Sequence, residues 1–427
     1  LPIGGRVGSC RASSFVSSAS LYAWGISLCA GAFMDPLSNM LKVRKNDLPL
    51  LYTVYFSFFT SGMMSTLIGS LLPSMKSEYE LSYVLGGAVL SAHQIGNFTA
   101  LILAGFLPYL LGRKKSTLIL SSGIIIGFTM MTLTGNPLTL IIAFVLTGVG
   151  RGTRSNITNV LISEITENKT AGLNLLHASF AIGAFLAPLV ALLTTSIRGV
   201  HWRLAAYLLI VLELFVLLAI GRSTISNTPT RREKGTRPDF LTDSSYWINT
   251  GILFFYLCTE ASVIGWLVTY FRDTGRLSAS LSLTTSTALW VFILIGRIFC
   301  AFLSTRMNKN ILLVILGSLQ LLFFLLMIGT RSIVLTYISL FGFGLAMSGT
   351  YPTTLSTMDP RYNASTIVTG MTIATASVGA ITMPIIVGSV AEKAGIGSGL
   401  ATISITIVTM LVLMVVKLLR ERPVTEG

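Results

Sequence analysis

The chain has 427 residues, of which 52% are hydrophobic and only 11% are charged. An ordinary soluble domain carries about 25% charged residues, so this composition cannot cover a water-facing surface. Soluble enzymes, nucleic-acid-binding proteins and disordered chains are therefore excluded. The net charge of +14 fits the basic cytoplasmic loops of a membrane protein better than a nucleic-acid partner.

The first 46 residues are expected to lie outside the fold. The chain begins at Leu1 rather than Met, whereas Met40 precedes a basic flank and the first long apolar run. These features favour a translation or cloning extension over residues 1–39. A cleaved signal peptide, or a further span over residues 20–34, is the alternative.

Twelve apolar runs follow, each long enough to cross a bilayer as an α-helix. We therefore expect an all-α polytopic membrane protein with a six-span half at 47–221, a connector at 222–245 and a second six-span half at 246–427. The spans are predicted near 50–73, 82–106, 116–134, 137–162, 171–197, 202–221, 246–271, 278–304, 311–328, 333–352, 363–389 and 396–419.

The two halves are related in sequence. Adding 196 to the residue numbers of the first, second, fourth and fifth spans places them on their counterparts in the second half. The same offset carries Gly183 and Pro188 onto Gly379 and Pro384. This pattern predicts two parallel repeats, which is the architecture of one large class of transporters.

The basic residues of the connectors predict the orientation. Most of them fall on the side that the N-terminal flank shares with the connector at 222–245. Because cytoplasmic loops are enriched in Lys and Arg, we expect both termini and this connector in the cytoplasm of a multi-pass plasma-membrane protein.

Charged side chains within spans are costly, so each is a functional candidate. Glu260 lies midway through the seventh span, where its carboxyl group could bind a solute or couple a proton. Arg151 could bind an anion or balance Glu260, and a permanent buried pair of the two is the alternative. Arg154 is expected at an inner gate or reaching the membrane surface. Glu213, in an aliphatic sixth span, is a weaker candidate, and Arg297 also lies within a span.

Uncharged polar and aromatic side chains near the middle of spans could complete a solute site. Amides and imidazoles suit hydroxyl-rich ligands, and indole rings can stack on a sugar, although helix packing is the alternative for each. The candidates are His93, Gln94, Asn97, Asn156, Tyr256, Trp266 and Trp290. His177 is expected to form a helix-packing hydrogen bond.

The connector GFLPYLLGRKKS resembles the loop signature of the major facilitator superfamily. The matching residues are Gly105, Leu107, Gly112, Arg113 and Lys114. The resemblance implies a conformational gate loop whose charges latch the two halves on the inner side. Tyr109 stands where the family has Asp, which weakens that latch.

Segments 174–188, 254–267, 289–297 and 342–352 resemble the fucose–proton symporter and hexose permease branch of that superfamily. The resemblance implies a monomeric secondary transporter that moves a sugar or sugar derivative with protons by alternating access, without a cofactor. The first span holds no acid and the fourth carries Arg151, which argues against fucose itself. An exporter of drugs or metabolites is the alternative, followed by a transport-inactive sensor.

Overall fold

The computed structural model describes residues 41–167, 169–196, 201–225, 240–304, 306–359, 362 and 366–420. Within these ranges the chain forms α-helices and one short 3-10 helix, η1 (Lys45–Asp47), and no β-strand. Residues 1–40 of the expected extension and most of the connector lie outside the described residues. The extension was expected to reach residue 46, but Leu41 and Val43 are buried in one hydrophobic cluster with Leu50 and Leu51.

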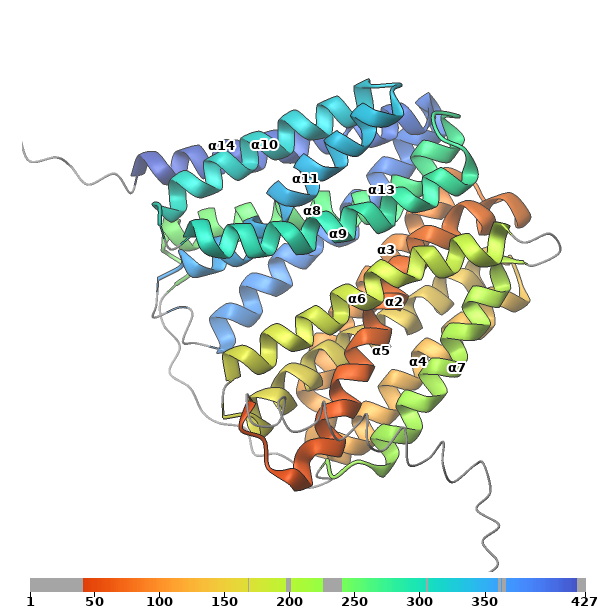
Figure 1. Cartoon of the computed structure of the whole chain (residues 1–427), viewed down its shortest axis with the longest axis vertical. Helices are drawn as coiled ribbons and strands as arrows, with labels where there is room; N and C mark the ends of the chain where they lie inside the picture. Colours follow the sequence, from red (N-terminus) through yellow and green to blue (C-terminus); the bar gives the residue numbers. More distant parts are fainter. Residues whose placement is uncertain are drawn as a thin grey trace, which may run out of the picture.

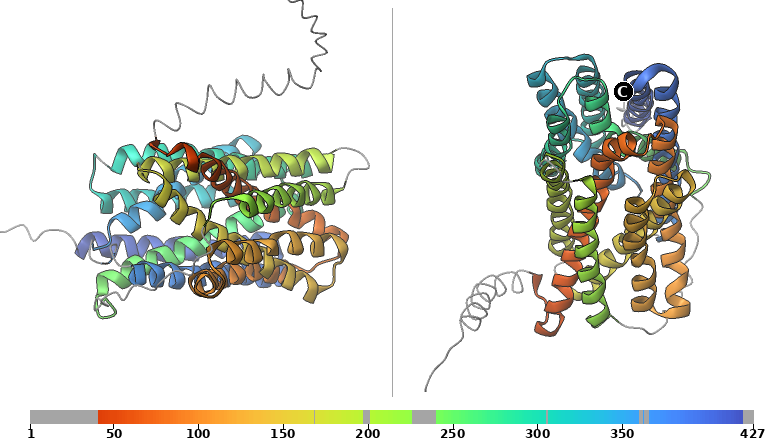
Figure 2. Two further views of the ribbon diagram at one scale, coloured as in Figure 1. Left: turned by 90° about the horizontal axis from the view of Figure 1, so that it is seen from below. Right: turned by 90° about the vertical axis from the view of Figure 1, so that its right-hand side faces the viewer.

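Within the described chain, twelve long α-helices form two groups of six, which are inclined to each other (Figure 1) and are seen from two further sides in Figure 2. The first group is α2 (Leu48–Glu78), α3 (Tyr83–Leu111), α4 (Arg113–Leu133), α5 (Pro137–Ile165), α6 (Lys169–Ser196) and α7 (Trp202–Arg222). The second group is α8 (Ser244–Asp273), α9 (Ala279–Ser304), α10 (Lys309–Gly329), α11 (Ile333–Ser356), α13 (Thr366–Ala401) and α14 (Ile403–Arg420). These helices are consistent with the twelve expected spans, and most extend beyond the apolar runs that predicted them.

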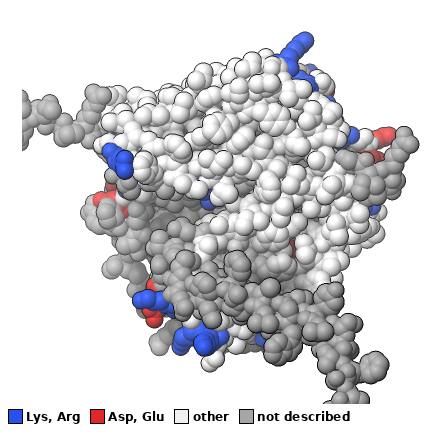
Figure 3. Space-filling view, viewed as in Figure 1, with Lys and Arg blue, Asp and Glu red and all other residues white. Residues whose placement is uncertain are grey.

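By length and composition, nine segments of the described chain could cross a membrane. One of them, Gly370–Arg420, contains parts of both α13 and α14. The helical path breaks within α13 where Gly395 takes a φ of 82°. Figure 3 shows a broad uncharged face, with Lys and Arg gathered toward its edges. Such a surface suits hydrocarbon, in which helices satisfy their own backbone groups, and the expected all-α membrane fold is confirmed.

The helix bounds repeat along the chain. A shift of 196 residues places the first residues of α2, α3, α4 and α5 on the first residues of α8, α9, α10 and α11. The repeat therefore includes the third helix of each half, for which the sequence alone gave no offset. Two halves built in the same order are typical of parallel-repeat transporters.

Equivalent residues also begin equivalent helices. Ser82 caps α3 by accepting a hydrogen bond from the Leu85 amide at 3.1 Å, and Ser278 accepts one from the Leu281 amide of α9 at 3.3 Å. Serine at this position satisfies a backbone amide that has no partner within its helix. The two caps are 196 residues apart, so the repeat also holds for the helix ends.

Within the N-terminal half, glycines let helix backbones touch. A Cβ atom on Gly148 of α5 would lie 1.9 Å from the carbonyl oxygen of His93 in α3. A Cβ on Gly183 of α6 would lie 1.9 Å from the carbonyl oxygen of Phe59 in α2. Small residues permit this close packing of membrane helices, which holds each half together as a unit.

The two halves also meet through backbone contacts at one end of the molecule, which we call the closed end (residues 69–90, 264–273 and 384–392). A Cβ on Gly69 would lie 2.4 Å from the Ile264 carbonyl oxygen, and one on Gly87 would lie 2.5 Å from that of Pro384. In this conformation the halves therefore leave no room for a side chain at these positions.

Polar contacts add to the closed end. The Tyr83 amide donates a hydrogen bond to Oε2 of Glu392 at 2.7 Å, and the Tyr83 hydroxyl donates one to Oδ2 of Asp273 at 2.8 Å. Lys76 forms an ion pair with the same Asp273 oxygen at 3.4 Å. Each of these contacts joins one half to the other, so all of them must break if this end opens.

Candidate solute site

Glu260 lies near the middle of α8 and is half-buried. Its Oε1 accepts a hydrogen bond at 2.9 Å from the hydroxyl of Tyr256, one helical turn away. Arg151 of α5 and Arg297 of α9 both interact electrostatically with Glu260. Neither forms an ion pair with it, since the ion pairs of the described chain all join other residues. The permanent pair of Glu260 and Arg151 is therefore absent from this conformation.

Further side chains surround this carboxylate. Tyr351 of α11 interacts electrostatically with Glu260, and its ring lies 5.9 Å from that of Tyr256. Arg297 interacts electrostatically with His177 of α6. We call the group of Arg151, His177, Tyr256, Glu260, Arg297 and Tyr351 the central cluster. Both halves and five helices contribute to it.

The formal charges of the central cluster do not cancel. It contains two guanidinium groups and one carboxylate, so it holds one positive charge in excess when His177 is neutral. A positive potential in a site between low-dielectric walls attracts an anion. The cluster can therefore bind a solute through charge as well as through hydroxyl and imidazole hydrogen bonds.

The polar candidates of α3 lie mainly against α5. His93 is buried, with its Nδ1 3.0 Å from Oγ1 of Thr147. A Cβ on Gly152 would lie 2.9 Å from Oδ1 of Asn97. These two side chains belong to the helix interface of the N-terminal half. Of the other amide candidates, Gln94 and Asn156 are half-buried.

The two tryptophan candidates differ in position. Trp266 is fully buried at the closed end, where its Nε1 donates a hydrogen bond to the Pro384 carbonyl at 3.2 Å. Trp290 lies edge-on to Phe180 of the other half, at a ring distance of 5.8 Å. In the described chain its buried Nε1 has no hydrogen-bond partner. Trp290, and not Trp266, therefore has a donor left for a solute.

The expected position of Arg154 at an inner gate or near the membrane surface is wrong. Its side chain is fully buried and forms an ion pair with Glu213, which is also fully buried. Its Nη1 donates hydrogen bonds to the Ser57 carbonyl at 3.2 Å and to Oγ1 of Thr60 at 2.9 Å. Because α2, α5 and α7 surround the guanidinium, its charge is matched inside the first half and not at its rim.

The predicted gate loop is a single residue. Gly112, with φ of 79°, ends α3 and precedes α4 directly. Nη1 of Arg113 donates to both carboxylate oxygens of Glu164, at 2.7 and 2.9 Å, and Nζ of Lys114 donates to the Ser223 carbonyl at 2.9 Å. These contacts join helices of the N-terminal half to one another. Gly105 lies within α3, four residues before Tyr109.

Fold and site together define a polytopic membrane transporter with two repeated halves and a charged cluster between them. The family model described as Major Facilitator Superfamily matches residues 54–376. The chain belongs to that superfamily, as its sequence predicts, and is a membrane transporter rather than an enzyme.

Relatives and solved structures agree with this class. The chain is 24% identical over 360 residues to an uncharacterized MFS-type transporter, YfkL, of Bacillus subtilis (strain 168), covering 80% of this chain and 89% of the relative. It is 24% identical over 354 residues to a gallate transporter of Pseudomonas putida, covering 70% and 75%. The crystal structure of a D-xylose-proton symporter superposes with a TM-score of 0.71 at 14% identity, covering 87% of this chain and 97% of that one. That likeness shows the fold, and the hexose branch stays a prediction.

Proposed function

We propose that the protein moves a small hydroxylated solute, in the first place a sugar or sugar derivative, across the plasma membrane by alternating access, with protons as the coupling ion. It acts as a monomer with both termini in the cytoplasm. With this orientation the closed end faces outward, and the conformation described above is inward-facing.

The position of Glu260 carries this proposal. The carboxylate has a hydroxyl partner on its own helix but no direct ion pair, while cations from both halves lie within electrostatic range. When the halves move, the distance from Glu260 to Arg151 of the other half changes, whereas Arg297 moves together with Glu260. The proton affinity of the carboxylate changes with its distance from Arg151. A group whose protonation differs between two facing states links a proton to a solute.

A hydroxylated carboxylic acid is the second candidate solute. The excess positive charge of the central cluster favours an anion, and one relative is named a gallate transporter. A sugar would use the hydroxyl and imidazole groups, whereas an acid would also need Arg151 or Arg297. Export of drugs or amphipathic metabolites is the remaining alternative, and a transport-inactive sensor is less favoured.

Glu260→Gln in proteoliposomes tests the coupling role. Wild-type protein should accumulate labelled solute when a pH gradient is imposed, and the variant should lose this accumulation. It should still exchange internal for external solute, because exchange needs no net proton movement. A panel of neutral sugars, hydroxylated acids and cationic drugs identifies the solute class.

Glu164→Gln is the matched control, since it makes the same chemical change at an ion pair outside the central cluster. It should retain accumulation. If Glu260→Gln accumulates solute as the wild type does, with unchanged pH dependence, then Glu260 does not couple protons. If the substitution lowers accumulation and exchange equally, Glu260 binds solute but does not couple it.

A further inference from the structure

A cavity lies at the closed end, outside the central cluster. It has a volume of about 340 Å³, within the range of small-molecule sites in proteins. Its walls come from both halves: α2, the end of α6 and the start of α7 on one side, and α8 and α9 on the other. Arg272 lies twelve residues beyond Glu260 on α8, which is about 18 Å along the helix axis. The cavity is therefore separate from the central cluster.

Arg272 gives this cavity a positive charge that no neighbouring acid neutralises. In the described chain its side chain has no ion pair, although Asp273 follows it directly and Glu78 contacts Trp202, which lines the cavity. Asp273 is held by Lys76 and Tyr83. Glu78 is held by Arg203 and the indole of Trp202. With both acids occupied, the guanidinium can form a bidentate pair with a carboxylate.

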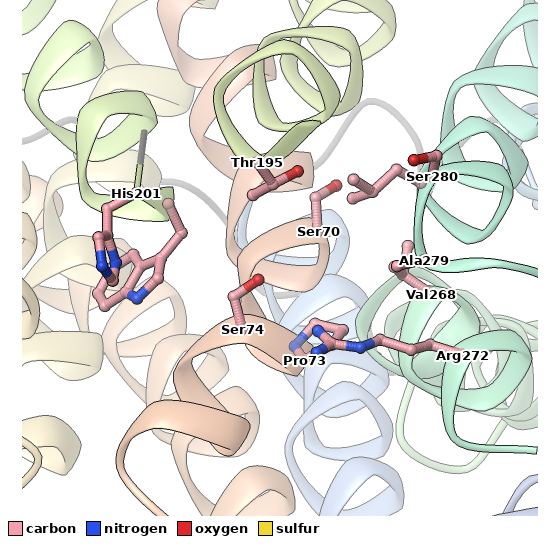
Figure 4. Close-up of a pocket in the computed structure, with 11 residues that line it drawn as sticks. Ser70, Pro73, Ser74, Thr195, His201, Val268, Arg272, Ala279 and Ser280 are labelled. Atoms are coloured by element: carbon pink, nitrogen blue, oxygen red, sulfur yellow. The ribbon is translucent and has the colours of Figure 1, made fainter. Parts of the chain in front are cut away.

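Four hydroxyl groups share the remaining lining with His201 and with apolar side chains (Figure 4). Ser70 and Thr195 already donate to backbone carbonyls of their own helices, at 2.9 and 2.7 Å, so their oxygens can accept. The side-chain hydroxyls of Ser74 and Ser280 have no hydrogen-bond partner within the described chain and can donate. Leu283 adds an apolar wall. Acceptors, donors and one cation together fit a small carboxylate that carries several hydroxyl groups.

We propose that this cavity is a vestibule site in which Arg272 binds the carboxylate of a hydroxylated organic acid before or after its passage through the central cluster. The assignment rests on the proposed function through its second candidate solute, a hydroxylated carboxylic acid. Because both halves build the walls, opening the closed end reshapes the site, and the acid is held there only while the halves are together.

Cysteine labelling tests the site without requiring transport. Ser280→Cys is made in a background in which Cys10, Cys29, Cys258 and Cys300 are alanine, and its reaction with an anionic and a cationic methanethiosulfonate is compared. Because a fixed charge concentrates counter-ions in a cleft, we expect the anionic reagent to gain roughly tenfold over its rate in the Arg272→Gln variant. Gluconate should slow the labelling, and glucose should not.

Four variants complete the design. Arg331→Gln removes one exposed charge away from the cavity and should leave reagent preference and gluconate protection unchanged. Arg272→Gln should abolish both the preference for the anionic reagent and the protection by gluconate. Arg151→Gln, which alters the central cluster, should leave protection intact. Thr195→Cys, on the opposite wall, serves as a second reporter of folded protein and should give the same pattern.

Two results overturn the site. In the first, gluconate does not slow the labelling of Ser280→Cys and Thr195→Cys although Arg272 is present. The other is protection that survives Arg272→Gln but disappears in Arg151→Gln, which would locate the acid in the central cluster. Proteoliposomes that transport neither gluconate nor glucose would count against the proposed function alone, because protection is read without transport.

Discussion

The buried pair of Arg154 and Glu213 offers a quantitative test of how the first half is held together. Both side chains are fully buried, and the guanidinium has further hydrogen bonds only to the neutral groups of Ser57 and Thr60 within the described chain. Glu213→Gln keeps the shape of the side chain and removes the single negative charge that faces the cation.

Breaking a buried ion pair by removing one partner costs about 3–5 kcal/mol, because a charge stays buried without compensation. The two neutral hydrogen bonds of Arg154 remain, so we expect a loss at the lower limit, about 3 kcal/mol. Replacing both residues by apolar ones of similar size, Arg154→Met with Glu213→Leu, should recover most of that loss, since no charge is then buried.

The free energy of unfolding of the purified protein, measured by denaturant titration in detergent, checks these values. Glu164→Gln is the control, because its ion pair with Arg113 is partly exposed: 45% of the Glu164 side chain and 26% of the Arg113 side chain are accessible to solvent. Exposed pairs contribute at most about 1 kcal/mol. The reasoning is refuted if Glu213→Gln lowers the free energy of unfolding by no more than Glu164→Gln does. It is also refuted if the double variant has a lower free energy of unfolding than Glu213→Gln.

Two further predictions concern the backbone and the closed end. Gly112→Ala should destabilise the protein by about 1–2 kcal/mol in the same titration, since an L-residue is strained at positive φ. The control, Gly397→Ala, should be neutral or stabilising, because a Cβ there has open space within a helix. Equal effects of the two substitutions on the free energy of unfolding would contradict this. Asp273→Asn weakens the contact with Lys76 and should raise the labelling rate of Ser70→Cys with a neutral maleimide, because Ser70 is only 3% exposed and is uncovered when the closed end opens. An unchanged rate would show that this carboxylate does not hold the end closed.

The architecture was largely predictable because it depends on properties that a single helix carries in its own sequence. Apolar length predicts each span, and the offset of 196 residues predicts which spans are equivalent. The ends were less predictable: the eleventh span was expected to stop at residue 389, but the helix continues to Gly395, where the backbone leaves the helical region. The length of an apolar run indicates how much of a helix lies in the hydrocarbon core of the bilayer. The helix itself continues beyond the core into the membrane–water interface.

The central cluster was predictable only in part. Glu260 and Arg151 stand out in sequence because a charge within a span is costly. Tyr351 did not, since a tyrosine near a helix end is unremarkable until the packing of α11 against α8 brings it near Glu260. Trp266 was misleading for the opposite reason, because its ring fills the closed end beside Tyr83, at a ring distance of 6.1 Å. The helical period predicts on which face of its helix a residue lies, but only the packing of the helices shows which residues that face contacts.

The glycine contacts of the closed end affect how the transporter changes state. Backbone atoms meet directly at Gly69 and Gly87, and Gly388 brings α13 against the Tyr83 carbonyl in the same way. Attraction between such atoms is short-ranged, so a gap of 0.5–1 Å already forfeits roughly a quarter to a half of it. Interdigitating side chains would lose their contacts gradually as the two halves separate, whereas direct backbone contacts are lost over a short movement. The closed end therefore either stays in contact or separates fully, and a partly open intermediate has few contacts to stabilise it.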